Sequence, residues 1–248
     1  MILTLRTAIV SDPGLVRTNN EDAAHASDRL IAVADGMGGL PAGEVASEIA
    51  IRALASVEWA PEGCEPLAML GDAVASANRQ IRAAIEADPA RQGMGTTLTA
   101  AMLRDGQLAL VHAGDSRAYL LRDGALARLT RDDTFVQALV DQGVVSQEEA
   151  RRHPQRSLVT RVLQGSDVAP SATVIPVAAG DRLLLCTDGL SDVVDDSTIG
   201  QTLAGHQEPR ECAEQLVKLA HQAGAPDNVT VVIADVVLNG APPAPQPG

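Results

Sequence analysis

Four aspartates stand at the ends of apolar runs in this 248-residue chain. Asp35 follows the run at residues 30–34, Asp115 and Asp188 follow similar runs, and Asp227 precedes the last one. Each of these residues alone is typical of a turn, because Asp-Gly after a strand is a common hairpin signal. If the four strand ends lie side by side, however, the four carboxylates meet at one edge of a sheet.

Such a cluster predicts a divalent metal site. Carboxylates without His or Cys partners offer only oxygen ligands, which suit Mg²⁺ or Mn²⁺ better than zinc. Two such ions roughly 3.5–4 Å apart can activate a water molecule for in-line displacement at phosphorus. Arg17 would then supply a planar donor fork for a phosphate, although the polar segment that carries Arg17, Glu21 and Asp22 is, taken alone, more typical of a solvated loop.

Other chemistries fit the sequence less well. The segment G-M-G-G-L-P (36–41) lacks the third glycine of the dinucleotide fingerprint, no G-x-x-x-x-G-K-[ST] occurs, and D-G-M-G-G does not match an EF-hand loop. Ser116 and Ser191 each have an Asp neighbour, but no His stands in an obvious nucleophile motif, so nothing supports a Ser-His-Asp triad. Asp105 and Asp123 lie in R-D-G turns and are predicted to be ordinary hairpin aspartates.

The composition of the chain limits which partners it is expected to bind and in which cellular compartment it is expected to work. The net charge of −13 argues against nucleic acid or an anionic membrane as a partner, since both require a basic surface. Three widely spaced cysteines indicate a reducing compartment. The chain opens with no secretory signal and contains no apolar run long enough to span a bilayer. We therefore expect a soluble, cytoplasmic monomer in which bound cations balance part of the excess acid.

Hydrophobic periodicity predicts an alternation of strands and helices. The expected helices lie at 42–57, 66–87, 196–204 and 209–222, and the expected strands at 2–10, 30–34, 171–177, 182–187 and from 229 onward. Short apolar runs separated by turns from Gly95 to about residue 128 predict a meander of four antiparallel strands. The Pro- and Gly-rich residues 239–248 are expected to form a frayed tail.

The short apolar runs that are typical of strands are absent from residues 131–167, which are predicted to contain two short helices. The segment is rich in arginine within an acidic protein. A movable flap that meets an anionic substrate and a solvated helical hairpin are equally good interpretations of this pattern.

Six motifs, in order, are similar to those of the metal-dependent protein Ser/Thr phosphatases of the PP2C (PPM) family in their bacterial form. The similarity extends over about residues 5–237. The motifs are R-T-N-N-E-D (17–22), A-D-G-M-G-G-x-x-x-G-E-x-A-S (34–47), G-T-T (95–97), H-A-G-D-S-R-A-Y-L (112–120), T-D-G-L-S-D (187–192) and D-N-V-T (227–230). The resemblance implies an α+β fold, a four-layer α-β-β-α sandwich with two central antiparallel sheets, as one catalytic domain over residues 1–238.

The resemblance also implies a binuclear Mn²⁺ or Mg²⁺ centre. By position, Asp35 would bridge both metals and the carbonyl of Gly36 would contact the second, while Asp188 and Asp227 would hold the first. Arg17 matches the phosphate-binding arginine, which makes Arg17 and Asp35 the expected catalytic residues.

Further residues are assigned by the same resemblance to the surroundings of the two metals. Glu21 and Asp22 would act largely through metal-bound waters, and Asn228 would flank the site. A weaker third metal would use Asp115, Asp188 and Asp192, with Ser157 of the flap nearby.

Position 37 departs from the eukaryotic pattern, where a His after the Asp-Gly is often assigned as the general acid. Met37 cannot donate a proton, so we hypothesise that a metal-bound water protonates the leaving Ser/Thr oxygen. The implied activity is hydrolysis of phosphoserine and phosphothreonine on proteins, including a Ser/Thr kinase and its substrates, in reversal of bacterial kinase signalling. The alternative is a pseudophosphatase scaffold, but the presence of Arg17, Asp35, Asp188 and Asp227 favours the enzyme.

Overall fold

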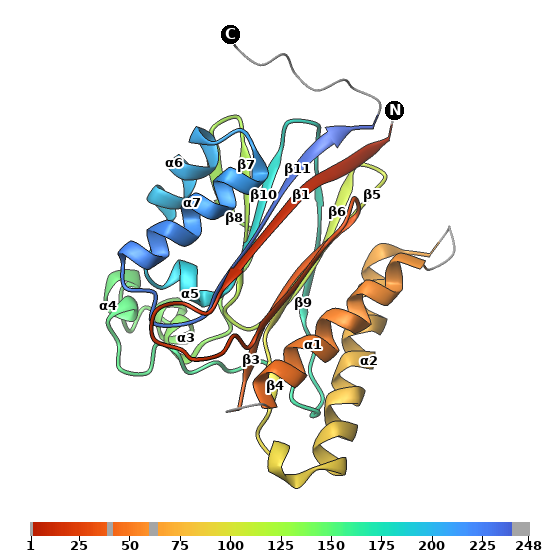
Figure 1. Cartoon of the computed structure of the whole chain (residues 1–248), viewed down its shortest axis with the longest axis vertical. Coiled ribbons are helices and arrows are strands. Elements are labelled where there is room, and N and C mark those ends of the chain that lie inside the picture. The colour runs from red at the N-terminus through yellow and green to blue at the C-terminus, as the bar shows by residue number, and fades with distance from the viewer. Residues whose placement is uncertain (1, 39–41, 60–63, 240–248) are drawn as a thin grey trace.

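The computed structural model describes residues 2–38, 42–59 and 64–239. Two antiparallel sheets pack face to face between two pairs of helices, which is the predicted α-β-β-α sandwich (Figure 1). In spatial order, one sheet contains β1 (Leu3–Asp12), β11 (Val229–Leu238), β10 (Arg182–Cys186), β7 (Arg117–Arg122) and β8 (Ala125–Arg128). The other contains β2 (Asp22–Ala26), β3 (Leu30–Met37), β5 (Leu98–Arg104), β6 (Gln107–Ala113) and β9 (Ser171–Pro176), with β4 (Gly95–Thr96) paired to β3.

Helices cover the outer faces of both sheets. Along the sheet that contains β3 lie α1 (Ala42–Ala55) and α2 (Pro66–Ala87), each followed by a 3₁₀ turn, η1 (Ser56–Trp59) and η2 (Pro89–Arg91). Along the sheet that contains β11 lie α6 (Asp196–Gly205) and α7 (Pro209–Gln222). The short helices α3 (Phe135–Asp141), α4 (Gln147–Arg151) and α5 (Asp188–Ser191) gather at the end of the sandwich opposite to the start of β1 and the end of β11 (Figure 1).

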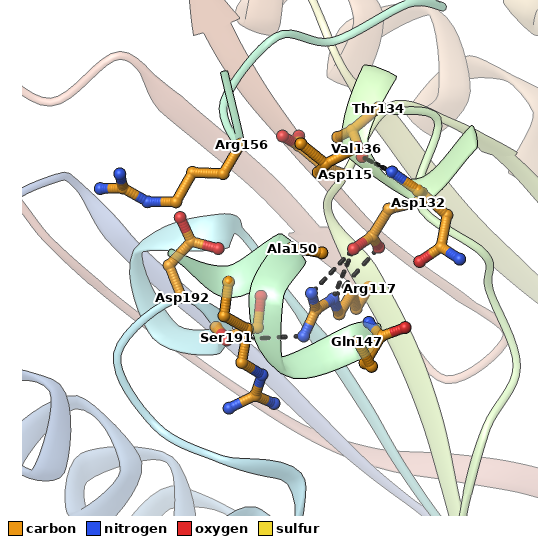
Figure 2. Close-up of a pocket in the computed structure, with 12 residues that line it drawn as sticks. Asp115, Arg117, Asp132, Thr134, Val136, Gln147, Ala150, Arg156, Ser191 and Asp192 are labelled. Carbon is orange, nitrogen blue, oxygen red and sulfur yellow. Dashed lines mark hydrogen bonds and ion pairs between the residues drawn. The ribbon is translucent and has the colours of Figure 1, made fainter. Parts of the chain in front are cut away.

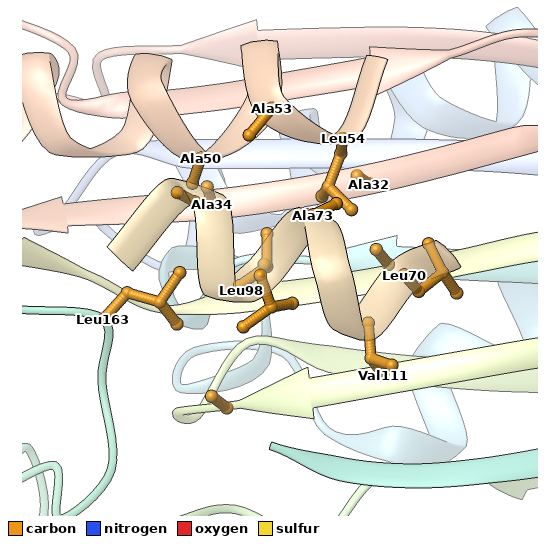
Figure 3. Close-up of a cluster of buried hydrophobic side chains, with 14 of the residues drawn as sticks. Ala32, Ala34, Ala50, Ala53, Leu54, Leu70, Ala73, Leu98, Val111 and Leu163 are labelled. Carbon is orange, nitrogen blue, oxygen red and sulfur yellow. The ribbon is translucent and has the colours of Figure 1, made fainter. Parts of the chain in front are cut away.

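The apolar runs that read as continuous in the sequence are strands buried on both faces. Ile31 and Val33 of β3 point into the layer between the two sheets, whereas Ala32 and Ala34 face the helices. Figure 3 shows the helix-facing layer, where α1 and α2 bring small and branched side chains such as Leu54 onto this strand. The small alanine side chains let the helices approach the sheet closely.

The expectation of a single four-stranded meander from Gly95 onward is wrong. Strands β5 and β6 belong to one sheet and β7 and β8 to the other, so the turn at 114–116 crosses between the sheets. Gly114 makes this crossing with a φ of +117°, a conformation that favours glycine, and a Cβ there would lie 2.6 Å from the Thr97 side chain. The two hairpins bury their apolar faces against each other instead of extending one sheet.

The R-D-G turns are hairpins, as predicted. Asp105 and Asp123 have φ values of 50° and 51°, and each is followed by a glycine with positive φ, which is the two-residue hairpin geometry. Strand β2 was not predicted, because D-A-A-H-A contains no β-branched or large aromatic residue and its pairing with β3 is a tertiary effect. The predicted tail beyond Asn239, like Gly39 of the D-G-M-G-G motif, lies outside the described residues.

Candidate metal centre

Strand register brings two aspartates together at the edge of one sheet. Strands β2 and β3 pair antiparallel with Asp22 directly opposite Asp35, so both side chains leave the same face. Burial raises the pKa of Asp22 to about 7. Burial also raises the pKa of Asp35 well above its usual range, and the neighbouring carboxylate of Asp22 adds to this shift.

The adjoining ends of β10 and β11 supply two more carboxylates. Asp188 opens α5 and is separated from β10 only by Thr187, and Asp227 is separated from β11 only by Asn228. A Cβ on Gly189 would lie 1.9 Å from the carbonyl oxygen of Asn228, so only glycine permits this close approach of the two segments. Burial raises the pKa of Asp188 well above its ordinary value, with Asp115 as the next contributor.

The backbone of Asp35 is held by the G-T-T motif. The Thr97 amide and the Thr96 hydroxyl both donate to the Asp35 carbonyl oxygen at 2.9 Å, while the Asp35 amide donates to the Thr97 hydroxyl at 3.0 Å. The Thr97 hydroxyl also meets the Ser116 hydroxyl at 2.8 Å, which connects this strand end to the turn that carries Asp115. Asp115 is buried, and burial raises its pKa to about 7.

Gly36 sits where a larger residue would not fit. A Cβ at this position would lie 2.2 Å from the carbonyl oxygen of Gly43, and a Cβ on Gly43 would lie 2.5 Å from a carboxylate oxygen of Glu21. The Glu21 carbonyl accepts hydrogen bonds from the Gly36 amide and the Ser47 hydroxyl. The glycines of the A-D-G-M-G-G-x-x-x-G-E motif therefore let α1, β3 and the segment before β2 converge at the site.

Asn228 holds the loop that carries Arg17. Its amide group donates to the carbonyl oxygens of Pro13 and Asn19, and its side-chain oxygen accepts from the Glu21 amide at 2.9 Å. From this loop Arg17 Nη2 donates to Asp227 Oδ2 at 2.8 Å, with the guanidinium still half exposed. Asn228 thus lines the cleft and acts on the loop through backbone contacts, while its role beside the metals stays a prediction.

An open cleft of about 680 Å³ unites most of the predicted site residues. Its lining includes Arg17, Glu21, Asp35, Gly36, Asp115, Ser157, Asp188, Asp227 and Asn228. Met37 also lines the cleft, whereas no His or Cys does among the described residues. The donor set that faces the cleft is therefore made of hard oxygen atoms, with Arg17 as its cation.

Asp192 faces a smaller cavity beside the cleft (Figure 2). Asp115 lines both spaces, whereas Asp188 lines the cleft and Asp192 lines the small cavity. The floor of the small cavity is a buried ion pair in which Arg117 Nη2 lies 2.7 Å from Asp132 Oδ2. The third metal therefore stays a prediction, with its three expected ligands divided between two adjoining cavities.

One feature of this arrangement fits a divalent cation. Asp22 Oδ1 and Asp188 Oδ1 are buried and have no hydrogen-bond partner among the described residues, which is costly for a carboxylate unless a cation meets it. Among the described residues, no group of three or more Asp, Glu, His or Cys side chains is placed so that these side chains alone could hold a metal ion. Mg²⁺ and Mn²⁺ tolerate such an open set, because they keep several waters and take few carboxylates each.

Thr187 is the first residue of the T-D-G-L-S-D motif, but the sequence alone did not indicate its role. The Thr187 hydroxyl donates to Asp22 Oδ2 at 2.8 Å and accepts from the Thr230 amide at 3.0 Å, so it joins the two sheets beneath the site. Its role could have been inferred from its position between a buried strand and Asp188, because a buried hydroxyl requires a hydrogen-bond partner.

Comparison with known proteins identifies the class to which this fold and site belong. The sequence profile of the protein phosphatase 2C family matches residues 16–225, and the chain belongs to this family. The crystal structure of the Mycobacterium tuberculosis serine/threonine phosphatase PstP/Ppp superposes with a TM-score of 0.92 at 53% identity, over 95% of this chain and 100% of that one. This similarity confirms the predicted fold class.

The curated PstP sequence of Mycobacterium tuberculosis is 55% identical over 235 residues, which are 95% of this chain and 46% of that protein. The chain thus spans about half the length of this relative. A structure of the PstP catalytic domain in complex with two manganese ions has a TM-score of 0.90 at 52% identity, over 96% of this chain and all of that one.

Proposed function

We propose that this chain is a Mn²⁺- or Mg²⁺-dependent phosphatase that hydrolyses phosphoserine and phosphothreonine esters on proteins. The observation that carries the proposal is the cleft itself, where Arg17 is the one cation among the described lining residues and the aspartates include Asp188, whose buried Oδ1 has no hydrogen-bond partner there. Membership of the protein phosphatase 2C family and the two manganese ions in the PstP catalytic domain support the same reaction and the same cofactor.

In this proposal the strand-end aspartates hold the metals. Asp35, Asp188 and Asp227, together with the Gly36 carbonyl, are the ligands of two ions, and Asp192 with Asp115 contributes to a weaker third. When bound, the ions supply Lewis acidity toward the phosphoryl group and lower the pKa of the attacking water. Burial, followed by repulsion from neighbouring aspartates, raises the pKa values of Asp35 and Asp188, and bound cations would offset both effects.

Arg17 is proposed to bind the phosphate. Its half-exposed guanidinium lines the cleft, and the hydrogen bond to Asp227 uses one of its donors while others remain available for phosphate oxygens. Because Asn228 fixes the loop at Pro13, Asn19 and Glu21, the arginine is held near the aspartates before substrate arrives. A group positioned in this way loses little conformational freedom on binding.

The proton for the leaving oxygen has no side-chain donor at position 37. Met37 lines the cleft with a thioether, and no His lines it among the described residues. We therefore propose that solvent within the cleft provides this proton, in keeping with the hypothesis drawn from the sequence.

The segment 131–167 is proposed to be a flap over one side of the site. It carries α3 and α4 between β8 and β9, and Ser157, Leu158 and Val159 line the cleft. Its base is fixed to the sandwich, since the Asp133 amide donates to the Gly114 carbonyl oxygen at 2.7 Å, and Arg161 pairs with the same buried Asp133 at 2.9 Å.

The proposed partners are phosphorylated proteins, including a Ser/Thr kinase and its substrates, so that the chain reverses bacterial Ser/Thr kinase signalling. A cytoplasmic location and a monomeric state are part of the proposal. Within the described residues, none of the helices has both the length and the apolar character that crossing a bilayer requires.

The test is hydrolysis of a phosphothreonine peptide by the purified chain with Mn²⁺, compared with Asp188→Asn. We expect turnover that requires Mn²⁺ and that the substitution removes. Tight binding of Mn²⁺ and of phosphopeptide without turnover in the native chain would instead identify a phosphoprotein-binding scaffold.

A further inference from the structure

We propose that Val16 and Leu158 form an apolar rim that binds aliphatic residues next to the phosphorylated residue of the substrate. The enzyme would then prefer phosphosites flanked by aliphatic side chains to sites flanked by charged ones. This inference rests on the proposed phosphatase function and specifies the class of protein segment that the cleft accepts.

Both side chains are unusually exposed for their type. Val16 retains 67% of its accessible surface and Leu158 retains 49%, yet both line the cleft that contains Arg17 and Asp35. Leu15, beside Val16, is 63% exposed. Exposed aliphatic residues that gather at a functional cleft are typical of a binding surface, because contact with a partner removes them from water.

The backbone beneath each side chain is fixed. The Leu15 amide donates to the Ala225 carbonyl oxygen at 2.9 Å, and Gly14 packs so closely that a Cβ would lie 2.2 Å from the Asp227 carbonyl oxygen. The exposure of Val16 is therefore a property of an anchored loop.

At Leu158, the Phe135 amide donates to the Leu158 carbonyl oxygen at 2.9 Å, and Thr134 pairs with Val159 in an isolated β-bridge. Leu158 is thus presented by a held segment as well. A rim whose two sides are both preorganised binds a peptide at a smaller entropic cost than a mobile one.

The rim is placed where residues that flank a phosphosite must pass. Val16 directly precedes the proposed phosphate-binding Arg17, and Leu158 directly follows Ser157, which also lines the cleft. An extended peptide advances about 3.3 Å per residue, so side chains one or two positions from the phosphoresidue come level with the rim.

The rest of the rim offers no charge for recognition. Thr18, Asn19, Met37, Ser157 and Val159 line the cleft, and all are uncharged. Among the described lining residues Arg17 is the one cation, and it is assigned to the phosphate, while the aspartates and Glu21 are assigned to the metals and their waters. A charged flanking residue therefore loses hydration at this rim without gaining an ion pair, whereas an aliphatic residue gains apolar contact.

The experiment compares phosphothreonine peptides that differ only in the residues on both sides of the phosphothreonine, which are Val, Ser, Lys or Glu. The enzymes are the native chain, Val16→Ser, Leu158→Ser and the double variant. Val144→Ser is the matched control, because Val144 is 63% exposed but does not line the cleft. Each kcat/KM is divided by that for a generic aryl phosphate, so that changes in the metal centre cancel.

For the native chain we expect the Val peptide to exceed the Lys and Glu peptides about tenfold, and each rim substitution to lower the Val peptide ratio about fivefold. Val144→Ser should leave this ratio unchanged. An unchanged ratio in the double variant, or an equal loss in Val144→Ser, overturns the proposal.

Binding of fluorescein-labelled versions of the same peptides, followed by anisotropy, separates this proposal from the proposed function. If the native chain does not hydrolyse the aryl phosphate, the phosphatase function fails, and the anisotropy still decides the rim. Weaker binding of the Val peptide by the double variant than by Val144→Ser supports the rim, and equal binding refutes it.

Discussion

Strands β10 and β11 carry aspartates at both ends, and the two ends differ in how the charges are compensated. At the end away from the cleft, Arg122 Nη2 lies 2.6 Å from Asp181 Oδ2, and Arg182 Nε lies 2.6 Å from Asp235 Oδ1. At the cleft end, Asp188 keeps a buried oxygen that no described residue meets. One pair of strands thus displays the same residue type in two electrostatic environments.

The pKa values of these groups record the difference. Burial would raise the pKa of Asp181, but hydrogen bonds from Arg122 and the Ala178 amide outweigh it and lower that pKa. Burial raises the pKa of Asp188, and further aspartates add to the shift. Buried carboxylates with arginine partners contribute to structure, whereas a group of carboxylates that raise one another's pKa in a cleft indicates function. The comparison therefore assigns stability to one end of the sandwich and chemistry to the other.

The largest effect is expected from removing a charge at the cleft end. Asp188→Asn should lower Mn²⁺-dependent kcat/KM by about 10³-fold or more, because a lost metal ligand removes several kcal/mol of transition-state stabilisation. The metal-free melting temperature should stay constant or rise, since the substitution relieves repulsion among buried acids.

The matched control for Asp188→Asn is Asp123→Asn, in a hairpin turn with a φ of 51° that Asn also adopts readily. It should change neither activity nor melting. A melting temperature that falls by 10 °C in Asp188→Asn would show that the carboxylate is structural and would break the comparison.

At the end of the strands away from the cleft, Asp235→Asn should destabilise the fold but leave the catalytic activity unchanged. Arg182 is buried, and losing its carboxylate partner should cost about 3 kcal/mol, or a fall of about 6–12 °C in melting temperature. The kcat measured well below the melting temperature should equal that of the native chain. A kcat reduced more than tenfold in the folded variant would contradict this division of roles.

The metal-free protein should lose stability as the pH rises from 5 to 8. Burial raises the pKa of both Asp22 and Asp115 to about 7, so the folded state retains protons that the unfolded state loses near pH 4. Their contribution is fully present below about pH 4 and is lost as the pH rises through about 7. Asp181, with its lowered pKa, acts in the opposite sense: its contribution is present above about pH 4 and is lost at lower pH.

Thermal melts in EDTA at pH 5, 6, 7 and 8 measure this dependence. Saturating Mn²⁺ should flatten it, because a cation stabilises the ionised carboxylates. A metal-free melting temperature that does not change between pH 5 and 8 would contradict the assignment of raised pKa values to Asp22 and Asp115.

The smallest effect is expected at position 37. Met37→His should change kcat at pH 7.5 by less than about threefold. It should also add an acidic limb to the profile of rate against pH, near the ordinary His pKa of about 6.5. The native chain should show no limb that belongs to a histidine. If the native profile already contains one that a His→Gln variant removes, the solvent origin of the leaving-group proton is wrong.

The sequence predicted the layers better than the pairing of strands. Helix α2 was predicted at its observed limits because Pro66 opens it and Asp88-Pro89 stops it, which are local signals. The meander was wrong because the crossing at Gly114 depends on two sheets packing together, and no local pattern encodes that choice.

The candidate site was predictable as a set of residues and not as an arrangement. Strand-end position and family resemblance selected Asp35, Asp188 and Asp227, all of which line the cleft. Neither could show that Asp22 is paired in register with Asp35, because β2 has weak strand propensity, nor that Thr187 supports Asp22 from the other sheet. Contacts between residues far apart in sequence arise only from the packed fold.

Titration calorimetry of the metal-free chain with Mn²⁺ shows whether the cleft aspartates form a cation site, as we claim. We predict two tightly bound ions per chain and, at pH 6.5, release of protons that appears as a buffer-dependent heat, since carboxylates with raised pKa must ionise to bind. Asp188→Asn should lose at least one of the two ions. Absence of Mn²⁺ binding at millimolar concentration, or a stoichiometry that Asp188→Asn leaves at two, would contradict the claim.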